Sequence, residues 1–316
     1  IQPTISQAEN KIKVKEKTMP NDWKWTKISD HDTLTEGPVW DGSGLLYNEC
    51  SANTTFRWDP KTNESSIWRE NTSAANGQTF DRQGQLFVCE GDAHRVTKVD
   101  PENPNAEPIV ISDAFKGDTM NWPNDIAVDQ KGRVYFTDPN YTGGARNLDH
   151  ESVYMAEHTF GGNWNTIRVT FDTHKPNGVL FSIDQKTLFV ADTPNQPEDP
   201  KRLLAYSVNE DGTLGDSQVL HDFGHGRSID GMTLSSAGTI LATAGSCSGG
   251  PGPMIYEFEA SGRVVRTHPT PADNPTNCTF GGSSLSTLFV TFMGGEVYQV
   301  DNVGHTGQLA YPQRRF

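Results

Sequence analysis

Six oxygen-bearing side chains recur at matching positions along the chain. Each lies 11 or 12 residues before the centre of a short apolar segment, and the six are Glu36, Asn76, Asn124, Asn177, Asp230 and Asn277. Carboxylate and amide oxygens are the preferred ligands of hard cations such as Ca²⁺, Mg²⁺ and Mn²⁺, whereas Zn²⁺ and Cu²⁺ favour sites with His or Cys. If the six side chains converge, they predict a site for one divalent ion, because the carboxylates of Glu36 and Asp230 would balance its charge.

A simpler explanation exists for each position taken alone. Asn and Asp followed by Gly commonly cap turns, and a Gly directly follows Glu36, Asn76, Asn177 and Asp230. Turn capping accounts poorly for six positions in one register. Six side chains also exceed what one ion needs beside water and a bound molecule. We therefore expect Glu36, Asn124, Asn177 and Asp230 to be the ligands, and Asn76 and Asn277 to contact the bound molecule.

The apolar segments that follow these positions form a repeat. Their centres, from Tyr47 to Phe289, are 40, 48, 54, 52 and 48 residues apart. Most are preceded by a polar turn and another short apolar strand, as in a hairpin. A strand-rich repeat of about 50 residues is typical of a four-stranded propeller blade. Six copies predict an all-β, six-bladed β-propeller, in which the first strand of each blade lines the central channel. A β-sandwich does not explain six hairpins in register.

The whole chain fits this single architecture. We expect one propeller domain over residues 21–316, preceded by an N-terminal arm, residues 1–20, that could pair with the last blade. The chain has 316 residues with 26 Lys+Arg and 40 Asp+Glu, so its formal net charge is −14. Such an acidic chain is a poor partner for nucleic acid. No apolar run approaches the roughly 20 residues of a membrane helix, which excludes an integral helical membrane protein.

The cysteines and the first residues bear on the compartment. The four cysteines form no C-x-x-C pair, and we expect buried thiols, with two disulfides as the alternative. The chain begins at Ile1 and continues with a polar stretch, which fits either a mature end left by signal-peptide removal or a trimmed sequence. We expect an exported protein, periplasmic or secreted, with a cytoplasmic location as the alternative. We expect a monomer or a weak homodimer.

The motifs around the six positions resemble the SMP-30/gluconolactonase/luciferin-regenerating-enzyme family, and its bacterial gluconolactonases most of all. The resemblance covers about residues 30 to 300. It rests on Glu36-Gly37-Pro38-Val39-Trp40, Asn76-Gly77, Pro123-Asn124-Asp125, Tyr135-Phe136-Thr137-Asp138-Pro139, Pro176-Asn177-Gly178, Asp230-Gly231-Met232 and Pro275-Thr276-Asn277-Cys278-Thr279-Phe280-Gly281-Gly282.

The resemblance implies a six-bladed propeller with one divalent metal, usually calcium. The positions matching Glu36, Asn177 and Asp230 would hold the ion, with the Asn124 position close by. The family's activities include hydrolysis of sugar lactones and, in more distant relatives, of organophosphates. Two departures affect the substrate. Relatives often have a basic or small polar residue just before the Asn124 position, where this chain has Asn121-Trp122-Pro123, and a Gly-rich loop spans residues 245–252.

We therefore expect a metal-dependent lactonase that opens a sugar lactone to an aldonic acid. The ion, most simply Ca²⁺ with Mg²⁺, Mn²⁺ or Zn²⁺ as alternatives, would polarise the lactone carbonyl. Asp230 would be the general base, and Asn124 would be the second catalytic residue. The expected substrate contacts are Asn76, Asn121, Trp122, His225 and Asn277.

Two other functions stay open. One is phosphotriester hydrolysis, with Asp230 attacking phosphorus directly. The other is a non-catalytic propeller that is stabilised by calcium and binds proteins. The chain has no G-x-S-x-G elbow, no phosphate-binding P-loop and no H-E-x-x-H zinc motif, so the sequence does not support those chemistries.

Overall fold

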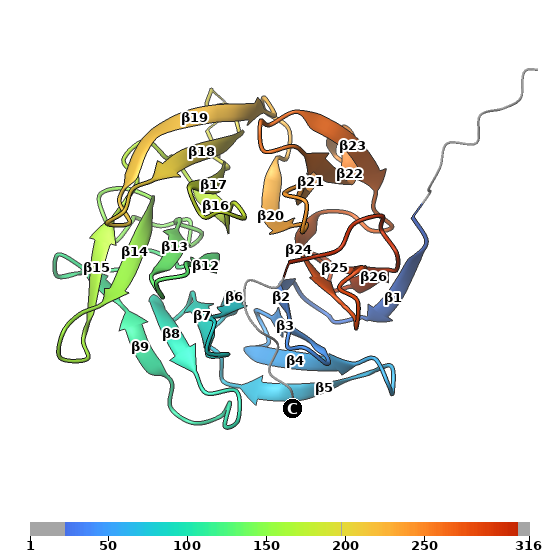
Figure 1. The fold of residues 1–316 in the computed structure, drawn as a ribbon, viewed down its shortest axis with the longest axis horizontal. Helices are drawn as coiled ribbons and strands as arrows, with labels where there is room; N and C mark the ends of the chain where they lie inside the picture. Colours follow the sequence, from blue (N-terminus) through green and yellow to red (C-terminus); the bar gives the residue numbers. More distant parts are fainter. Residues whose placement is uncertain (1–22, 197, 309–316) are drawn as a thin grey trace, which may run out of the picture.

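A computed structural model describes residues 23–196 and 198–308. Six four-stranded antiparallel sheets are arranged around a central channel (Figure 1). This arrangement confirms the predicted all-β, six-bladed propeller. In the described part of the chain no helix is long and apolar enough to span a membrane.

Blades 1 to 5 are meanders whose strands run outward from the channel in chain order, and blade 6 takes its outermost strand from the start of the described chain. Blade 1 consists of β2 (Thr35–Trp40), β3 (Leu45–Glu49), β4 (Thr54–Asp59) and β5 (Glu64–Glu70). Blade 2 consists of β6 (Ala75–Phe80), β7 (Leu86–Glu90), β8 (Arg95–Val99) and β9 (Ile109–Ser112). Blade 3 consists of β12 (Ile126–Val128), β13 (Val134–Asp138), β14 (Ser152–His158) and β15 (Trp164–Arg168). A short hairpin precedes blade 3, made of β10 (Ala114–Phe115) and β11 (Asp118–Thr119).

The second half of the chain repeats the plan. Blade 4 consists of β16 (Pro176–Phe181), β17 (Thr187–Asp192), β18 (Arg202–Val208) and β19 (Leu214–Asp222). Blade 5 consists of β20 (Ile229–Leu234), β21 (Ile240–Ser246), β22 (Gly249–Phe258) and β23 (Val264–Pro269). Blade 6 consists of β24 (Pro275–Gly281), β25 (Thr287–Phe292), β26 (Val297–Val300) and β1 (Trp25–Ser29).

The ring is closed by a strand from near the start of the chain. Strand β1 completes blade 6 by pairing antiparallel with β26, with Trp25 opposite Val300. The two ends of the described chain therefore meet in one sheet. The predicted arm, residues 1–20, lies outside the described residues.

The repeated apolar segments are the second strands of the blades. They are β3, β7, β13, β17, β21 and β25, and the sequence had placed all six. Their residues are almost all buried, because these strands are covered on both faces by neighbouring blades. In β13, for example, Tyr135 packs edge-on against Phe181 of blade 4, with ring centroids 5.0 Å apart.

The cysteines differ in one respect from the expectation of buried thiols. All four are free, and Cys50, Cys89 and Cys278 are buried, but Cys247 is exposed. Cys247 lies in the tight turn between β21 and β22, where no neighbouring blade covers it. The expectation of four buried thiols was wrong at this position.

Candidate metal centre and active site

The innermost strand of each blade carries one of the six predicted residues at or just before its start. Five of these strands, β2, β6, β16, β20 and β24, have a register irregularity within the three residues around the predicted position. A bulge of this kind bends the strand and redirects a side chain. In β2 the irregularity lies between Glu36 and Val39. The bulges explain how an otherwise regular sheet directs its first side chains into the channel.

The glycines that follow these residues allow neighbouring blades to approach closely. A Cβ on Gly37 would lie 2.0 Å from the carbonyl oxygen of Asn76 in the next blade. A Cβ on Gly178 would lie 2.4 Å from the carbonyl oxygen of Asp230, and one on Gly231 would lie 2.1 Å from the Asn277 side chain. The recurring Gly therefore serves blade-to-blade contact around the ring, beyond any capping of turns.

The six predicted side chains, Glu36, Asn76, Asn124, Asn177, Asp230 and Asn277, are called the ring below. Glu36 is buried on its blade 1 side. Its Oε2 accepts hydrogen bonds from its neighbour's backbone, Gly37 N at 2.7 Å, and from Asn277 Nδ2 at 3.2 Å. The pKa of Glu36 is raised well above its ordinary range, chiefly by burial and next by the negative charge of Asp230. Neither hydrogen-bond donor carries a positive charge, so the ionised form of Glu36 is poorly compensated.

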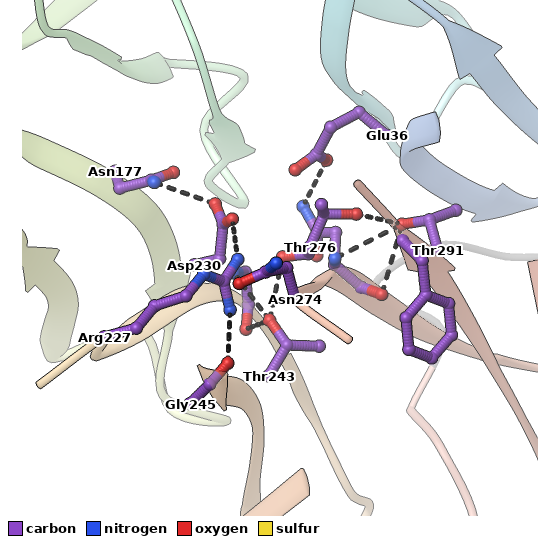
Figure 2. A network of polar contacts seen from close by, with 12 residues as sticks. Glu36, Asn177, Arg227, Asp230, Thr243, Gly245, Asn274, Thr276 and Thr291 are labelled. Atoms are coloured by element: carbon purple, nitrogen blue, oxygen red, sulfur yellow. Dashed lines mark hydrogen bonds and ion pairs between the residues drawn. The ribbon is translucent and has the colours of Figure 1, made fainter. Parts of the chain in front are cut away.

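Asp230 faces the channel from blade 5 and has two donors (Figure 2). Asn177 Nδ2 donates to Oδ1 at 2.8 Å, and the Arg227 guanidinium donates to Oδ2 at 2.6 Å. Burial raises the pKa of Asp230, while Arg227 and the Asn177 hydrogen bond oppose that rise. Water can still reach Asp230, whose side chain is 17% exposed.

The donor set fits a hard divalent ion. The described residues contain no group of three or more His, Cys, Asp and Glu side chains that could hold a metal, so any ion at the ring also needs amide oxygens. Glu36, Asp230 and Asn177 supply two carboxylates and an amide from three blades, and the charge of Asp230 reaches Glu36. Two neighbouring carboxylates, of which Glu36 has no positively charged partner among its described contacts, favour binding of a cation between them.

The other three ring residues, Asn124, Asn277 and Asn76, form different hydrogen bonds. Asn124 is buried, and its backbone is fixed by hydrogen bonds from its N to Thr137 O and from Gly77 N to its own carbonyl oxygen. Asn277 donates to Glu36 and also accepts from Cys278 N through Oδ1. Asn76 binds the Asn48 amide through its backbone carbonyl.

Three predicted substrate contacts lie outside the ring and have different environments. Asn121 is 2% exposed, and its Oδ1 and Nδ2 are bonded to Leu148 N and to the Asp138 carbonyl. The Asn121 side chain therefore connects two loops, and its role as a substrate contact stays a prediction. Trp122 is partly exposed and lies close against Gly91. His225 is exposed in the loop before β20.

The sequence reasoning missed two groups at this end of the channel. Arg227, three residues before Asp230, binds that carboxylate directly. Tyr141 is 40% exposed, and its pKa is raised by desolvation and further by the negative charges of Asp230 and Glu36. Lys175 Nζ lies 4.2 Å from the centroid of the Tyr141 ring. An Arg three residues before a ring acid was visible in the sequence, but Tyr141 lies in a loop with no periodic signal.

A cavity of about 260 Å³ occupies the rest of the channel. It runs from Gly37, Asp125 and Asn277 to the hairpin turns at Asp41 and Asp81. The described residues that line it do not include Glu36, Asn177 or Asp230. Glu36, Asn177 and Asp230 lie at the starts of the inner strands, at the opposite end of the channel from these hairpin turns.

The fold and the ring define a class: a six-bladed propeller that gathers carboxylate and amide side chains from its inner strands at one end of the channel. Residues 34–294 match the SMP-30/gluconolactonase/LRE-like region, and the chain belongs to this family. The resemblance inferred from the motifs is confirmed.

Named relatives cover most of the chain. A gluconolactonase of Zymomonas mobilis subsp. mobilis is 27% identical over 283 residues, which cover 81% of this chain and 75% of the relative. A pentonolactonase of Haloferax volcanii is 28% identical over 274 residues, which cover 83% of this chain and 82% of the relative. The solved structure of a gluconolactonase from Xanthomonas campestris has a TM-score of 0.74 at 25% identity, and the match covers 89% of each chain.

Proposed function

We propose that this protein is a divalent-cation-dependent lactonase, a carboxylic-ester hydrolase that opens a sugar lactone to an aldonic acid. The observation that carries the proposal is the pair of neighbouring carboxylates, Glu36 and Asp230, with Asn177 bonded to the second. Membership of the family, with relatives named gluconolactonase and pentonolactonase, supports this reaction class.

The residues that would hold the ion are Glu36, Asn177 and Asp230, with Asn124 beside them. When bound, the ion supplies Lewis-acid polarisation of the lactone carbonyl. Two carboxylates with amide oxygens favour Ca²⁺, and Mg²⁺ and Mn²⁺ share the preference for oxygen ligands. Zn²⁺ is the least suited of the ions considered, because the ring has no His or Cys.

The chain's own residues divide the remaining work. Asp230, held by Asn177 and Arg227, accepts a proton from the water that attacks the lactone carbonyl carbon. The carbon–oxygen bond of the lactone then breaks, and the lactone ring oxygen takes up a proton to become a hydroxyl group. Asn124 donates an N–H group to the carbonyl oxygen as negative charge develops there. The Tyr141 hydroxyl borders the space in which the sugar hydroxyls would lie.

The experiment is a panel of aldonolactones assayed with a pH indicator. The protein is treated with chelator, and Ca²⁺, Mg²⁺, Mn²⁺ or Zn²⁺ is then restored separately. We expect acid release from at least one five- or six-membered sugar lactone, its loss in chelator, and best recovery with Ca²⁺. Turnover that persists in chelator would contradict the role of the ion. No turnover of any lactone, with calcium-dependent melting, would indicate a stabilised binding protein instead.

A further inference from the structure

Arg227 is a positively charged residue inside the proposed ion site. Its guanidinium lies 2.6 Å from Asp230 Oδ2, and the two side chains are only 20% and 17% exposed. Ion pairs that are partly shielded from water are stronger than exposed ones. Asp230 thus has a permanent cation beside it, while Glu36 has none among its described contacts.

The backbone of blade 5 fixes Arg227 in place. Its second guanidinium nitrogen donates to the Gly245 carbonyl at 3.2 Å, and Gly245 N donates back to the Arg227 carbonyl at 3.0 Å (Figure 2). Gly245 has a φ of +81°, and an added Cβ would lie 2.0 Å from Gly252 O. Only glycine fits there, which gives the first residue of the Gly-rich loop at 245–252 a role in holding Arg227.

The Asp230 carboxylate cannot bind both the Arg227 guanidinium and a divalent ion at full strength. A divalent ion at the ring needs the negative charge of Asp230, and Arg227 already neutralises part of it. An Arg side chain cannot lose its charge at ordinary pH, so an incoming ion must share Asp230 with the guanidinium or displace it.

We propose that Arg227 is a resident counter-cation of the ring, which lowers the affinity for the divalent ion and stabilises the protein when no ion is bound. This inference rests on the ion site proposed above and adds a residue that sets its affinity. The protein would thereby keep its fold at low ion concentration and respond to the ion over a higher concentration range.

The test compares Arg227→Met with the wild type. Isothermal titration calorimetry after chelator treatment gives the Ca²⁺ dissociation constant, and thermal melting is followed in chelator and in saturating Ca²⁺. We expect Arg227→Met to bind Ca²⁺ about 10-fold more tightly, which is about 1.4 kcal/mol. Its melting temperature should fall in chelator by about 2–4 °C, and Ca²⁺ should raise it more than it raises that of the wild type.

Two further variants separate charge from packing. Arg227→Lys keeps a positive charge but loses the two-pronged guanidinium, and should shift the dissociation constant in the same direction by a smaller factor. It also keeps the test decisive if Arg227→Met folds poorly. The control is Arg57→Met, because Arg57 and Asp41 form a similar pair at 2.6 Å far from the ring acids. This variant should lose equal stability with and without Ca²⁺, at unchanged affinity.

The outcomes distinguish this inference from the proposed function. If the wild type binds Ca²⁺ and shows ion-dependent lactone hydrolysis, but Arg227→Met binds Ca²⁺ equally or more weakly, Arg227 only orients Asp230 and the inference is overturned alone. If neither protein binds Ca²⁺, Mg²⁺ or Mn²⁺, the proposed ion site is wrong and the inference falls with it.

Discussion

The two acids of the ring have opposite surroundings. On the blade 5 side, Asp230 has a guanidinium and an amide donor, one for each oxygen. On the blade 1 side, Glu36 has only a backbone N–H and the Asn277 amide, and its pKa is raised well above the ordinary range. The protein therefore offsets part of the cost of burying Asp230 as an anion, whereas Glu36 has no positively charged partner among its described contacts.

This difference assigns separate tasks to the two acids. An anion that is held in place and reached by water suits a general base, and Asp230 fits that description. Glu36 is costly to ionise without a nearby cation, and this cost makes ion binding beside it favourable. Removing each acid should therefore produce different consequences, and four experiments test how far the difference extends.

The largest effect is expected for Asp230→Ala. Loss of the base and of one ion ligand should lower kcat/KM for the best lactone by at least about 1,000-fold, in the range expected for a general base. Steady-state kinetics gives the value, and circular dichroism checks the fold. Activity within about 10-fold of the wild type would remove Asp230 from the proposed mechanism.

The second experiment applies the same neutral change to each acid. In chelator at pH 8, Glu36→Gln should raise the free energy of unfolding by about 1–2 kcal/mol, because a poorly compensated buried charge is removed. Asp230→Asn should lower it by about 1–3 kcal/mol, because Arg227 loses its partner. Urea unfolding measures both. Effects of the same sign would show that the two acids do not differ in how the protein stabilises their charge.

A third buried carboxylate, Asp138, lies outside the ring and has no positively charged donor among its described hydrogen bonds. Asp138 is fully buried, accepts hydrogen bonds from Asn121 N and Trp122 N, and has its pKa raised to about 7 by burial. The folded state therefore binds the proton of the Asp138 carboxyl group more tightly than the unfolded state does. The stability that Asp138 contributes is therefore complete below about pH 4 and is lost as pH rises through 7.

Between pH 5 and 7 this loss should amount to about 2 kcal/mol. Asp138→Asn should make unfolding free energy less dependent on pH by that amount, as measured by urea unfolding across the range. Parallel curves for the variant and the wild type would show that Asp138 does not titrate in this window.

The smallest effect on stability is expected from a substitution at a glycine where two blades touch. Gly178→Ala places a Cβ 2.4 Å from Asp230 O, which must push blades 4 and 5 apart. We expect a loss of about 1–2 kcal/mol in stability and weaker Ca²⁺ binding. The control is Gly144→Ala, whose Cβ would have no neighbour closer than 3.7 Å. Equal effects of the two substitutions would argue against close contact between blades at the ring.

Much of the architecture could be predicted because it is periodic. The repeated second strands gave six blades, and counting back from them located Glu36, Asn177 and Asp230 at the starts of inner strands. The contacts of Asn121 could not be predicted, since they depend on loop residues far along the chain, including Leu148. Arg227 was missed for a related reason: its role depends on the bulged start of β20 and on the Gly245 carbonyl.

Glu36, Asn177 and Asp230 are proposed to hold one divalent ion together at the end of the channel. The most direct measurement is anomalous X-ray diffraction from crystals grown with Mn²⁺, and then with Ca²⁺. We predict a single strong peak at about 2.0–2.6 Å from carboxylate oxygens of both Glu36 and Asp230. An ion that lies elsewhere, or no peak at saturating ion concentration, would show that these three residues do not form the ion site.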